Sequence, residues 1–322
     1  MLRMAVTVVS YNARDDLLAC VRSIRQAASP PPPTVLVDNG STDGGPALVR
    51  AEFPDTEVVV DPANRGYGAA ANLGARATDT PYLFVLNSDT VLAPGAVDAL
   101  SDYLDAHPRV AIAGPRLRGP DGTLEPSCHP PLGTLRSVLE KGSLGRAIAG
   151  LPGVGARWAL LNWAHDRARA VPWVTGAALA IRRSAFDAVG GFDEGYFMYA
   201  EEADLCWRCR EAGWEVHFAP VTDVIHRGAA STAPLRGAMA LQKVRSAIRF
   251  YRRHYAAPRA ALLVLGIRTA MLFRWCRDGL RLRVAGDPLT RSRLAEDVAV
   301  WRRALRRPEA DPLGAARSGC GS

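Results

Sequence analysis

Three carboxylates stand close together in the stretch 189–214, which reads VGGFDEGYFMYAEEADLCWRCREAGW. Glu201, Glu202 and Asp204 follow an aromatic run and open a segment of helical spacing that ends at Gly213. Acidic side chains suit the N-terminus of a helix. They also repel one another, which can raise the pKa of one of them toward the value that a general base needs near neutral pH. The stretch predicts either an acidic first turn that faces solvent or a general base.

Other polar side chains stand where four apolar, strand-like runs end. They are Tyr11 and Asn12, then Asp38, then Asn64, Arg65 and Gly66, and finally Asn87, Ser88 and Asp89. If the strands are parallel, these ends meet at one edge of the sheet, where open α/β sheets bind ligands. Asp38 is suited to a ribose hydroxyl or a base N–H, and Asp89 to Mg²⁺ or Mn²⁺ that holds a diphosphate. Taken singly, each aspartate could instead cap a turn or a helix.

The elements that must position these residues alternate between strand and helix. Short apolar runs rich in valine are typical of buried parallel strands, and apolar residues three and four apart indicate the helices between them. Repeated βα units favour a right-handed, doubly wound sheet. The predicted strands are 5–9, 34–37, 58–60, 82–86, 173–181 and 215–218, and the helices between the first four are 15–26, 46–53 and 69–77.

The chain is expected to have two domains, 1–232 and 233–322. Within the first, 115–172 is rich in Pro, Gly and Arg, and we expect an insertion or a lobe on the acceptor side there. The second carries the net positive charge, because residues 231–322 hold 19 Lys and Arg against 6 Asp and Glu, whereas the first 230 hold 21 against 26. We therefore predict a catalytic domain followed by a basic helical extension, whose tail after Arg306 is disordered.

The charge of the extension indicates a polyanionic partner. The run 260–275 is apolar but holds Arg268 and Arg274, and it is too short to cross a bilayer, which takes about 20 apolar residues. A basic amphipathic helix of this kind can lie in the interface of an anionic membrane. The alternative is a helix pair packed on the main domain. Nucleic acid is excluded, because the extension lacks stacking and DNA-reading motifs and the rest of the chain is mildly acidic.

Cysteine usage and the N-terminus bear on the compartment. Cys206 and Cys209 form a C-x-x-C, but no second pair or histidine cluster follows at zinc-site spacing, so packing is the favoured role. The chain starts without the pattern of a signal peptide. We expect a reduced, cytoplasmic protein.

Seven blocks recur in a characteristic order. They are VVSYN at 8–12, VDNGSTDG at 37–44, NRGYGAAAN at 64–72, LNSDT at 86–90, WVTGAALAIRR at 173–183, GGFDEGYFMYAEEADLCWR at 190–208 and HRGAAS at 226–231. Together they resemble glycosyltransferase family 2, and within it the rhamnosyltransferase-like bacterial enzymes, over about residues 4–232. The resemblance implies the GT-A fold, a Rossmann-like and mostly parallel α/β sheet, and sugar transfer with inversion at the anomeric carbon.

The resemblance also implies roles for single residues. Asp89 would be the metal-binding aspartate, with Asn87 in place of the first aspartate of the family's D-x-D motif, and His226 would complete the metal or diphosphate site. The base would be Glu202, with Glu201 as the contender, because the family has an aspartate where this chain has Glu202. The nucleotide sugar would be bound by Ser10, Tyr11, Asn12, Asp38, Asn64, Arg65, Gly66, Asn87, Ser88, Gly176 and Ala177.

The expected activity is a metal-dependent, inverting transfer of a sugar from a nucleoside-diphosphate sugar. Rhamnose from dTDP-rhamnose is favoured, and a UDP-sugar is the alternative. The acceptor would be a hydroxyl of a cell-surface polysaccharide or a lipid-linked glycan, with the enzyme peripheral on the inner face of the cell membrane. Two other functions stay open. One is a catalytically inactive sugar-nucleotide-binding protein, because Asn87 and Glu202 stand where the family has aspartates. The other, less favoured, is a nucleotidyltransferase, which should have a glycine-rich basic loop after its first strand, where this chain has Ser10, Tyr11 and Asn12.

Overall fold

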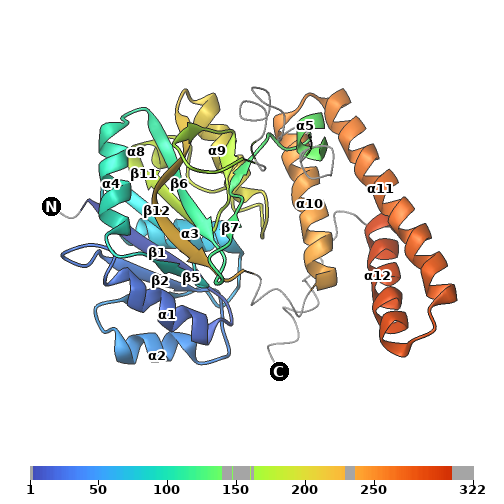
Figure 1. Ribbon diagram of the computed structural model, residues 1–322, viewed down its shortest axis with the longest axis horizontal. Coiled ribbons are helices and arrows are strands. Elements are labelled where there is room, and N and C mark those ends of the chain that lie inside the picture. Colours follow the sequence, from blue (N-terminus) through green and yellow to red (C-terminus); the bar gives the residue numbers. More distant parts are fainter. Residues whose placement is uncertain (1–2, 140–146, 148–159, 161–162, 229–235, 307–322) are drawn as a thin grey trace. The chain divides into compact units, whose positions relative to one another are not determined.

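The computed structural model describes residues 3–139, 147, 160, 163–228 and 236–306. The chain divides into two compact units (Figure 1). The first comprises Met1–Phe197 and Glu201–Ser231, and the second comprises Met198–Ala200 and Thr232–Ser322. The short segment Met198–Ala200 thus belongs with the C-terminal helices, although it lies between two parts of the first unit in the sequence. The assignment of 1–232 as a catalytic domain and 233–322 as an extension stays a prediction.

Among the described residues, a ten-stranded sheet forms the centre of the first unit, in the order β3-β2-β1-β4-β11-β6-β12-β5 with β7 on β6 and β9 on β12. The strands are β1 (Met4–Ser10), β2 (Thr34–Asp38), β3 (Glu57–Val60), β4 (Tyr82–Asn87), β5 (Thr90–Leu92), β6 (Val110–Arg118), β7 (Leu124–Glu125), β9 (Arg169–Ala170), β11 (Ala178–Arg182) and β12 (Glu215–His226). Strands β3, β2, β1 and β4 are parallel, as are β6 and β12, while β11 and β5 run antiparallel to their neighbours. The predicted mostly parallel α/β sheet is confirmed.

Alternate side chains of the central strands face two different helical layers. In β4, Phe84 and Leu86 pack with α1 (Arg14–Ile24), α2 (Gly45–Glu52) and α4 (Ala96–Ala106), whereas Leu83 and Val85 pack on the opposite face. That face is covered by α3 (Tyr67–Arg76), α8 (Arg183–Ala188) and α9 (Glu201–Glu211). Because both faces are covered, the strands are apolar throughout, which explains the continuous valine-rich runs. Figure 1 shows the sheet with helices packed around it.

The small residues of α3 allow that helix to approach the sheet closely. A Cβ added at Gly74 would lie 2.2 Å from Cγ2 of Thr7 on β1, so a larger residue has no room. The helix begins at Tyr67, immediately after the β3–α3 loop. Close packing therefore holds the C-terminal half of α3 directly against the middle of β1.

Two segments differ from the sequence-based expectation. The strand predicted at 173–181 is divided into β10 (Trp173–Val174) and β11, because Thr175, Gly176 and Ala177 leave the sheet between them. β10 pairs instead with β8 (Cys128–His129). The boundary predicted at 115 falls inside β6, and the described part of 115–172 contributes β7, β8, α5 (Leu135–Leu139) and β9; its remainder lies outside the described residues.

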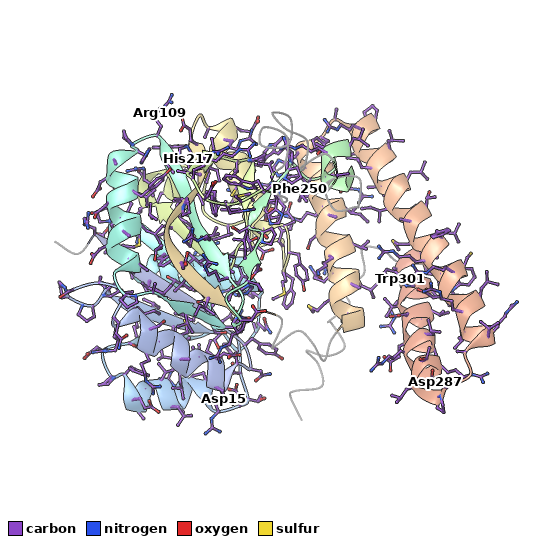
Figure 2. The ribbon with its side chains drawn as sticks, viewed as in Figure 1. Asp15, Arg109, His217, Phe250, Asp287 and Trp301 are labelled. Carbon is purple, nitrogen blue, oxygen red and sulfur yellow. The ribbon has the colours of Figure 1, made fainter. Side chains whose placement is uncertain are left out.

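The second unit consists of α10 (Arg236–His254), α11 (Ala257–Val284) and α12 (Pro288–Arg306). The three helices share a small core, in which Leu241, Met271 and Ala304 are buried. The indole Nε1 of Trp301 donates to the buried carboxylate of Asp278 over 3.2 Å and joins α12 to α11. Figure 2 labels Trp301 on α12. The predicted C-terminal helical extension is confirmed, and the tail predicted to be disordered lies outside the described residues. No helix among the described residues combines the length and the apolar character needed to cross a membrane.

Candidate active site

The strand register aligns the predicted polar residues along one edge of the sheet. Asp38 is the partner of Ser10 on β1 and of Val60 on β3. Asn87 is the partner of Val9, and its backbone N–H donates to the carbonyl of Ala177 over 3.0 Å. Strand β11 is antiparallel and starts just after Ala177, so Gly176 and Ala177 reach the same edge from the other direction. The parallel strands β1, β2 and β4 and the antiparallel strand β11 thus bring these residues together.

Asp89 and His226 lie next to each other at this edge. His226 ends β12 and pairs with Thr90 of β5, which places its Nε2 3.5 Å from Oδ1 of Asp89. The other ring nitrogen, Nδ1, is 2.9 Å from Oε2 of Glu125 on β7. Burial would lower the pKa of His226, but hydrogen bonds and charge interactions with the two carboxylates outweigh burial and raise it to about 10. Without a metal ion, the imidazole is therefore a cation between two carboxylates.

These residues fit a divalent cation that is shared with a diphosphate. A carboxylate oxygen and an imidazole nitrogen converge, and Glu125 orients the imidazole through its second nitrogen, the common arrangement of metal-binding histidines. Mg²⁺ in particular takes its remaining ligands from phosphate and water. The described part of the chain holds no group of three or more His, Cys, Asp or Glu side chains that could bind a metal ion by themselves. Binding of an ion at Asp89 and His226 would therefore need further ligands from a bound diphosphate.

The acidic residues at the start of α9 have distinct surroundings. Asp204 is fully buried, and its Oδ2 accepts a hydrogen bond from Nε of Arg208 over 2.7 Å, so it holds the helix in place. Glu201 is also buried, and burial followed by the charge of Glu202 raises its pKa well above the ordinary value. Glu202 is only partly buried and packs on Gly176, where an added Cβ would lie 3.4 Å from its Cβ and Cγ. Glu202 is therefore the more exposed residue of the pair, although Oε2 of each carboxylate is buried.

Tyr67 is influenced both by Asp89 and by the glutamates at the start of α9. Its hydroxyl donates to the carbonyl of Gly176 over 2.8 Å. Burial raises the pKa of Tyr67, and the negative charges of Glu201, Glu202 and Asp89 raise it further. Negative charges from elements more than a hundred residues apart thus act on this one hydroxyl. Tyr67 was not among the predicted site residues, although it stands within the NRGYGAAAN block; Glu125 also was not, and no local pattern marks it.

Two of the predicted nucleotide-binding residues shape the turn that follows β2. Asp38 accepts from the backbone N–H of Ser41 with both carboxylate oxygens, at 3.1 and 3.2 Å, so it does cap the turn. Asn12, which has a φ of 47°, accepts from the N–H of Thr42 over 2.8 Å. Beside them Ser10 is buried, and Tyr11 is exposed. The turn is thus built by side chains of both loops.

The β3–α3 loop is fastened to the segment before α9. Arg65 forms ion pairs with Asp61, at 3.0 Å, and with Glu194, at 3.4 Å, and Asn64 has a φ of 44°. Gly66 has a φ of 102°, and the following N–H, of Tyr67, donates to the carbonyl of Phe197 over 2.9 Å. The carboxylates hold the guanidinium of Arg65, and the glycine permits the close approach of two backbones. In the structure, Asn64, Arg65 and Gly66, which were predicted to bind the donor, therefore hold the β3–α3 loop in place.

Comparison with known proteins shows the family to which the chain belongs. A model of Glycosyl transferase family 2 matches residues 5–150, and one of Glycosyl transferase family group 2 matches residues 157–315. N-acetylglucosaminyl-diphospho-decaprenol L-rhamnosyltransferase of Mycobacterium tuberculosis is 35% identical over 248 residues, which cover 71% of this chain and 77% of that protein. The chain belongs to glycosyltransferase family 2. The predicted family and its rhamnosyltransferase-like branch are confirmed.

Other similarities of this family 2 glycosyltransferase cover fewer residues or have a lower sequence identity. Rhamnosyltransferase WbbL of Escherichia coli is 46% identical over 56 residues, 17% of this chain and 21% of that protein. The mannosyltransferase PcManGT of Pyrobaculum calidifontis, solved with GDP-Man and Mn²⁺, has a TM-score of 0.53 at 18% identity and covers 99% of this chain and 87% of that one. GalNAc-T7, solved with UDP, GalNAc and Mn²⁺, has a TM-score of 0.52 at 16% identity and covers 70% of this chain but only 44% of that one. These two structures confirm the GT-A fold.

Proposed function

We propose that this glycosyltransferase moves rhamnose from dTDP-rhamnose to a hydroxyl of a lipid-linked glycan or cell-surface polysaccharide, with inversion at the anomeric carbon. The observation that carries the proposal is that Glu202 packs on Gly176 at the edge of the sheet where Asp89 lies beside His226. In this proposal Asp89 contributes to diphosphate binding and Glu202 acts as the base. The name of the 35% identical relative supports rhamnose and a lipid-linked acceptor. A UDP-sugar is the alternative donor.

Glu202 is proposed as the general base. Its side chain lies against Gly176, beside the end of β4, and is partly open to solvent. In the reaction it removes the proton from the acceptor hydroxyl while that oxygen attacks the anomeric carbon on the face opposite the diphosphate. One displacement with one base inverts the anomeric configuration. Glu201, buried and with a raised pKa, is proposed to stay protonated and to pack beneath the site.

Asp89 and His226 are proposed to hold Mg²⁺ or Mn²⁺ together with the donor diphosphate. When bound, the ion supplies positive charge that stabilises the leaving nucleoside diphosphate. Glu125 then keeps the imidazole oriented through its bond to Nδ1. The donor would lie along the adjoining strand ends, against Ser10, Tyr11, Asn12, Asp38, Asn64, Arg65, Gly66, Asn87 and Ser88.

A lipid-linked acceptor would place the reaction at a membrane. We infer that the protein is cytoplasmic and peripheral on the inner face of the cell membrane, and that the basic C-terminal unit meets the anionic surface. The excess of Lys and Arg over residues 231–322, 19 against 6 acidic residues, supports this. Nucleic acid is not proposed as a partner.

A thermal-shift screen, followed by a transfer assay, tests the proposed donor. A ligand present at about 100 times its Kd stabilises the folded state by about 2.7 kcal/mol, a shift of several degrees in Tm for a domain of this size. We expect dTDP-rhamnose with Mn²⁺ to raise Tm more than UDP-sugars or GDP-mannose do. We also expect rhamnose to be transferred to a polyprenyl-diphosphate-linked sugar. The proposal is overturned if no nucleotide sugar shifts Tm and none is consumed.

A further inference from the structure

Helix α11 has apolar side chains on two opposite faces. One face is buried against α10 and α12 and includes Ala260, Val264 and Met271. The other is exposed. Its large apolar residues are between 49% and 83% exposed, and they are Leu262, Leu265, Leu272, Phe273, Leu280 and Val284. The core of the second unit therefore covers only part of the apolar surface of this helix.

The exposed residues form one continuous stripe. Their spacings of three, seven, one, seven and four keep them within about one third of the helix circumference, at 100° per residue. The stripe runs for about 33 Å, because 22 residues separate its ends at a rise of 1.5 Å each. Exposed Thr269 and Cys276 fill the gaps, and the hydroxyl of Thr269 donates to the carbonyl of Leu265 rather than to solvent. We call these eight residues the outer stripe.

Arginines border the outer stripe. Helix α11 holds Arg259, Arg268, Arg274, Arg277, Arg281 and Arg283 and a single acidic residue, Asp278. Asp278 is buried and bonded to Arg277 and to Trp301, so it is not available to a partner. The accessible charge of the helix is therefore positive along its whole length. Arginines beside an apolar stripe can extend their guanidinium groups toward lipid phosphates while their stems cover the apolar surface.

This charge decides between two occupants of the outer stripe. A second copy of the chain would bring two rows of arginines together, with no accessible carboxylate on α11 to offset their repulsion. An anionic bilayer instead supplies hydrocarbon for the stripe and phosphates for its borders. We propose that the outer stripe lies in the plane of an anionic membrane and is the surface by which the protein binds lipid. The choice of a membrane rests on the proposed lipid-linked acceptor, but the stripe itself is independent of the active site.

Vesicle sedimentation of the full-length protein tests this surface. We expect wild type to sediment with vesicles of phosphatidylcholine and phosphatidylglycerol at low salt, and much less with phosphatidylcholine alone. Replacing Phe273 and Leu280 together by Gln should weaken binding at least about tenfold, because each side chain otherwise removes apolar area from water. Leu289→Gln is the matched control, because Leu289 is equally exposed but lies on α12. The control should bind as wild type does.

Two results would overturn the proposal. One is failure of wild type to bind anionic vesicles. The other is that light scattering finds wild type to be a dimer and the double variant a monomer, while the variant binds vesicles as well as wild type does. The outer stripe would then be an interface between copies of the chain. Circular dichroism and the Tm shift with nucleotide sugar, measured on each variant, show that the fold and the donor site are intact. A donor shift without vesicle binding refutes only the membrane surface, and vesicle binding without a donor shift refutes only the proposed activity.

Discussion

Gly66 and Phe197 approach so closely that a Cβ on Gly66 would lie 2.1 Å from the carbonyl oxygen of Phe197. The contact joins the β3–α3 loop to the segment that leads into α9. It thereby fixes the start of α3, where Tyr67 lies, relative to the chain just before Glu201. The close pairing of these two backbones sets the distance between the phenol and the acidic residues of the site.

Gly66→Ala is expected to disrupt this contact. Gly66 has φ 102° and ψ 177°, a region that is essentially restricted to glycine, and the new methyl group would collide with the backbone. We expect a loss of several kcal/mol in the free energy of unfolding, measured with urea. Gly95→Ala is the control, because Gly95 also has a positive φ, of 74°, but nothing lies within 4 Å of its Cβ position. It should lose only about 1 kcal/mol, the cost of the backbone conformation; equal losses would mean that the contact with Phe197 contributes nothing.

The two glutamates at the start of α9 are expected to respond differently to amidation. Glu202→Gln keeps the shape of the side chain but cannot accept a proton, so kcat should fall by about 10² to 10⁴ with donor binding unchanged. Glu201→Gln resembles the protonated form that burial favours, and should therefore keep most of the activity. Transfer assays and donor titrations on both variants check this. The reverse order of losses would make Glu201 the base.

How far the sequence predicts the site depends on which interactions position each residue. Valine-rich runs fix the strands locally, and parallel pairing then aligns Ser10, Asp38 and Asn87. Glu125 could not be found this way, because it belongs to a strand of two residues that exists only through its pairing with β6. The break in the strand predicted at 173–181 is likewise tertiary, since Gly176 leaves the sheet to meet Glu202 and Tyr67.

Metal binding at Asp89 and His226 should strengthen as the pH rises. Because its pKa is raised to about 10, His226 carries a proton at neutral pH, and an ion that binds Nε2 must displace it. The affinity for Mn²⁺ in the presence of dTDP, measured by titration calorimetry, should therefore increase up to about tenfold per pH unit between about pH 7 and 9. In the His226→Gln variant this pH dependence should disappear. A flat profile in wild type would show that His226 is not a ligand.

The same group makes the metal-free protein sensitive to pH in the opposite direction. The folded pKa of His226 lies above its ordinary value of 6.5, so the stabilisation from its ion pairs is complete below about pH 6.5 and is lost as the pH rises through about 10. The Tm of wild type without Mn²⁺ should fall across this range more than the Tm of His226→Gln. Parallel Tm curves for the two proteins would contradict the protonated state described above.

Ser246 is expected to act as a positioning residue for the start of α9. Tyr199 and Ala200, just before Glu201, both have a positive φ, of 68° and 67°, which costs of order 1 kcal/mol or more each in residues other than glycine. The carbonyl of Met198 accepts from Oγ of Ser246 over 2.7 Å, within the second unit, and this bond holds the strained segment.

Ser246→Ala removes that hydrogen bond and leaves the Met198 carbonyl to Gln242 alone, at 3.4 Å. The segment can then relax and shift the carboxylates that follow it, so kcat should fall about tenfold or more. The KM for the donor should stay within about twofold, because the substitution leaves the strand ends proposed to bind the nucleotide unchanged. Ser246→Thr retains the hydroxyl and should restore most of kcat. Ser101→Ala is the matched control, since Ser101 is a buried helical serine bonded only to its own helix at Val97. A loss of stability equal to that of Ser101→Ala with unchanged kcat would reduce Ser246 to a packing residue.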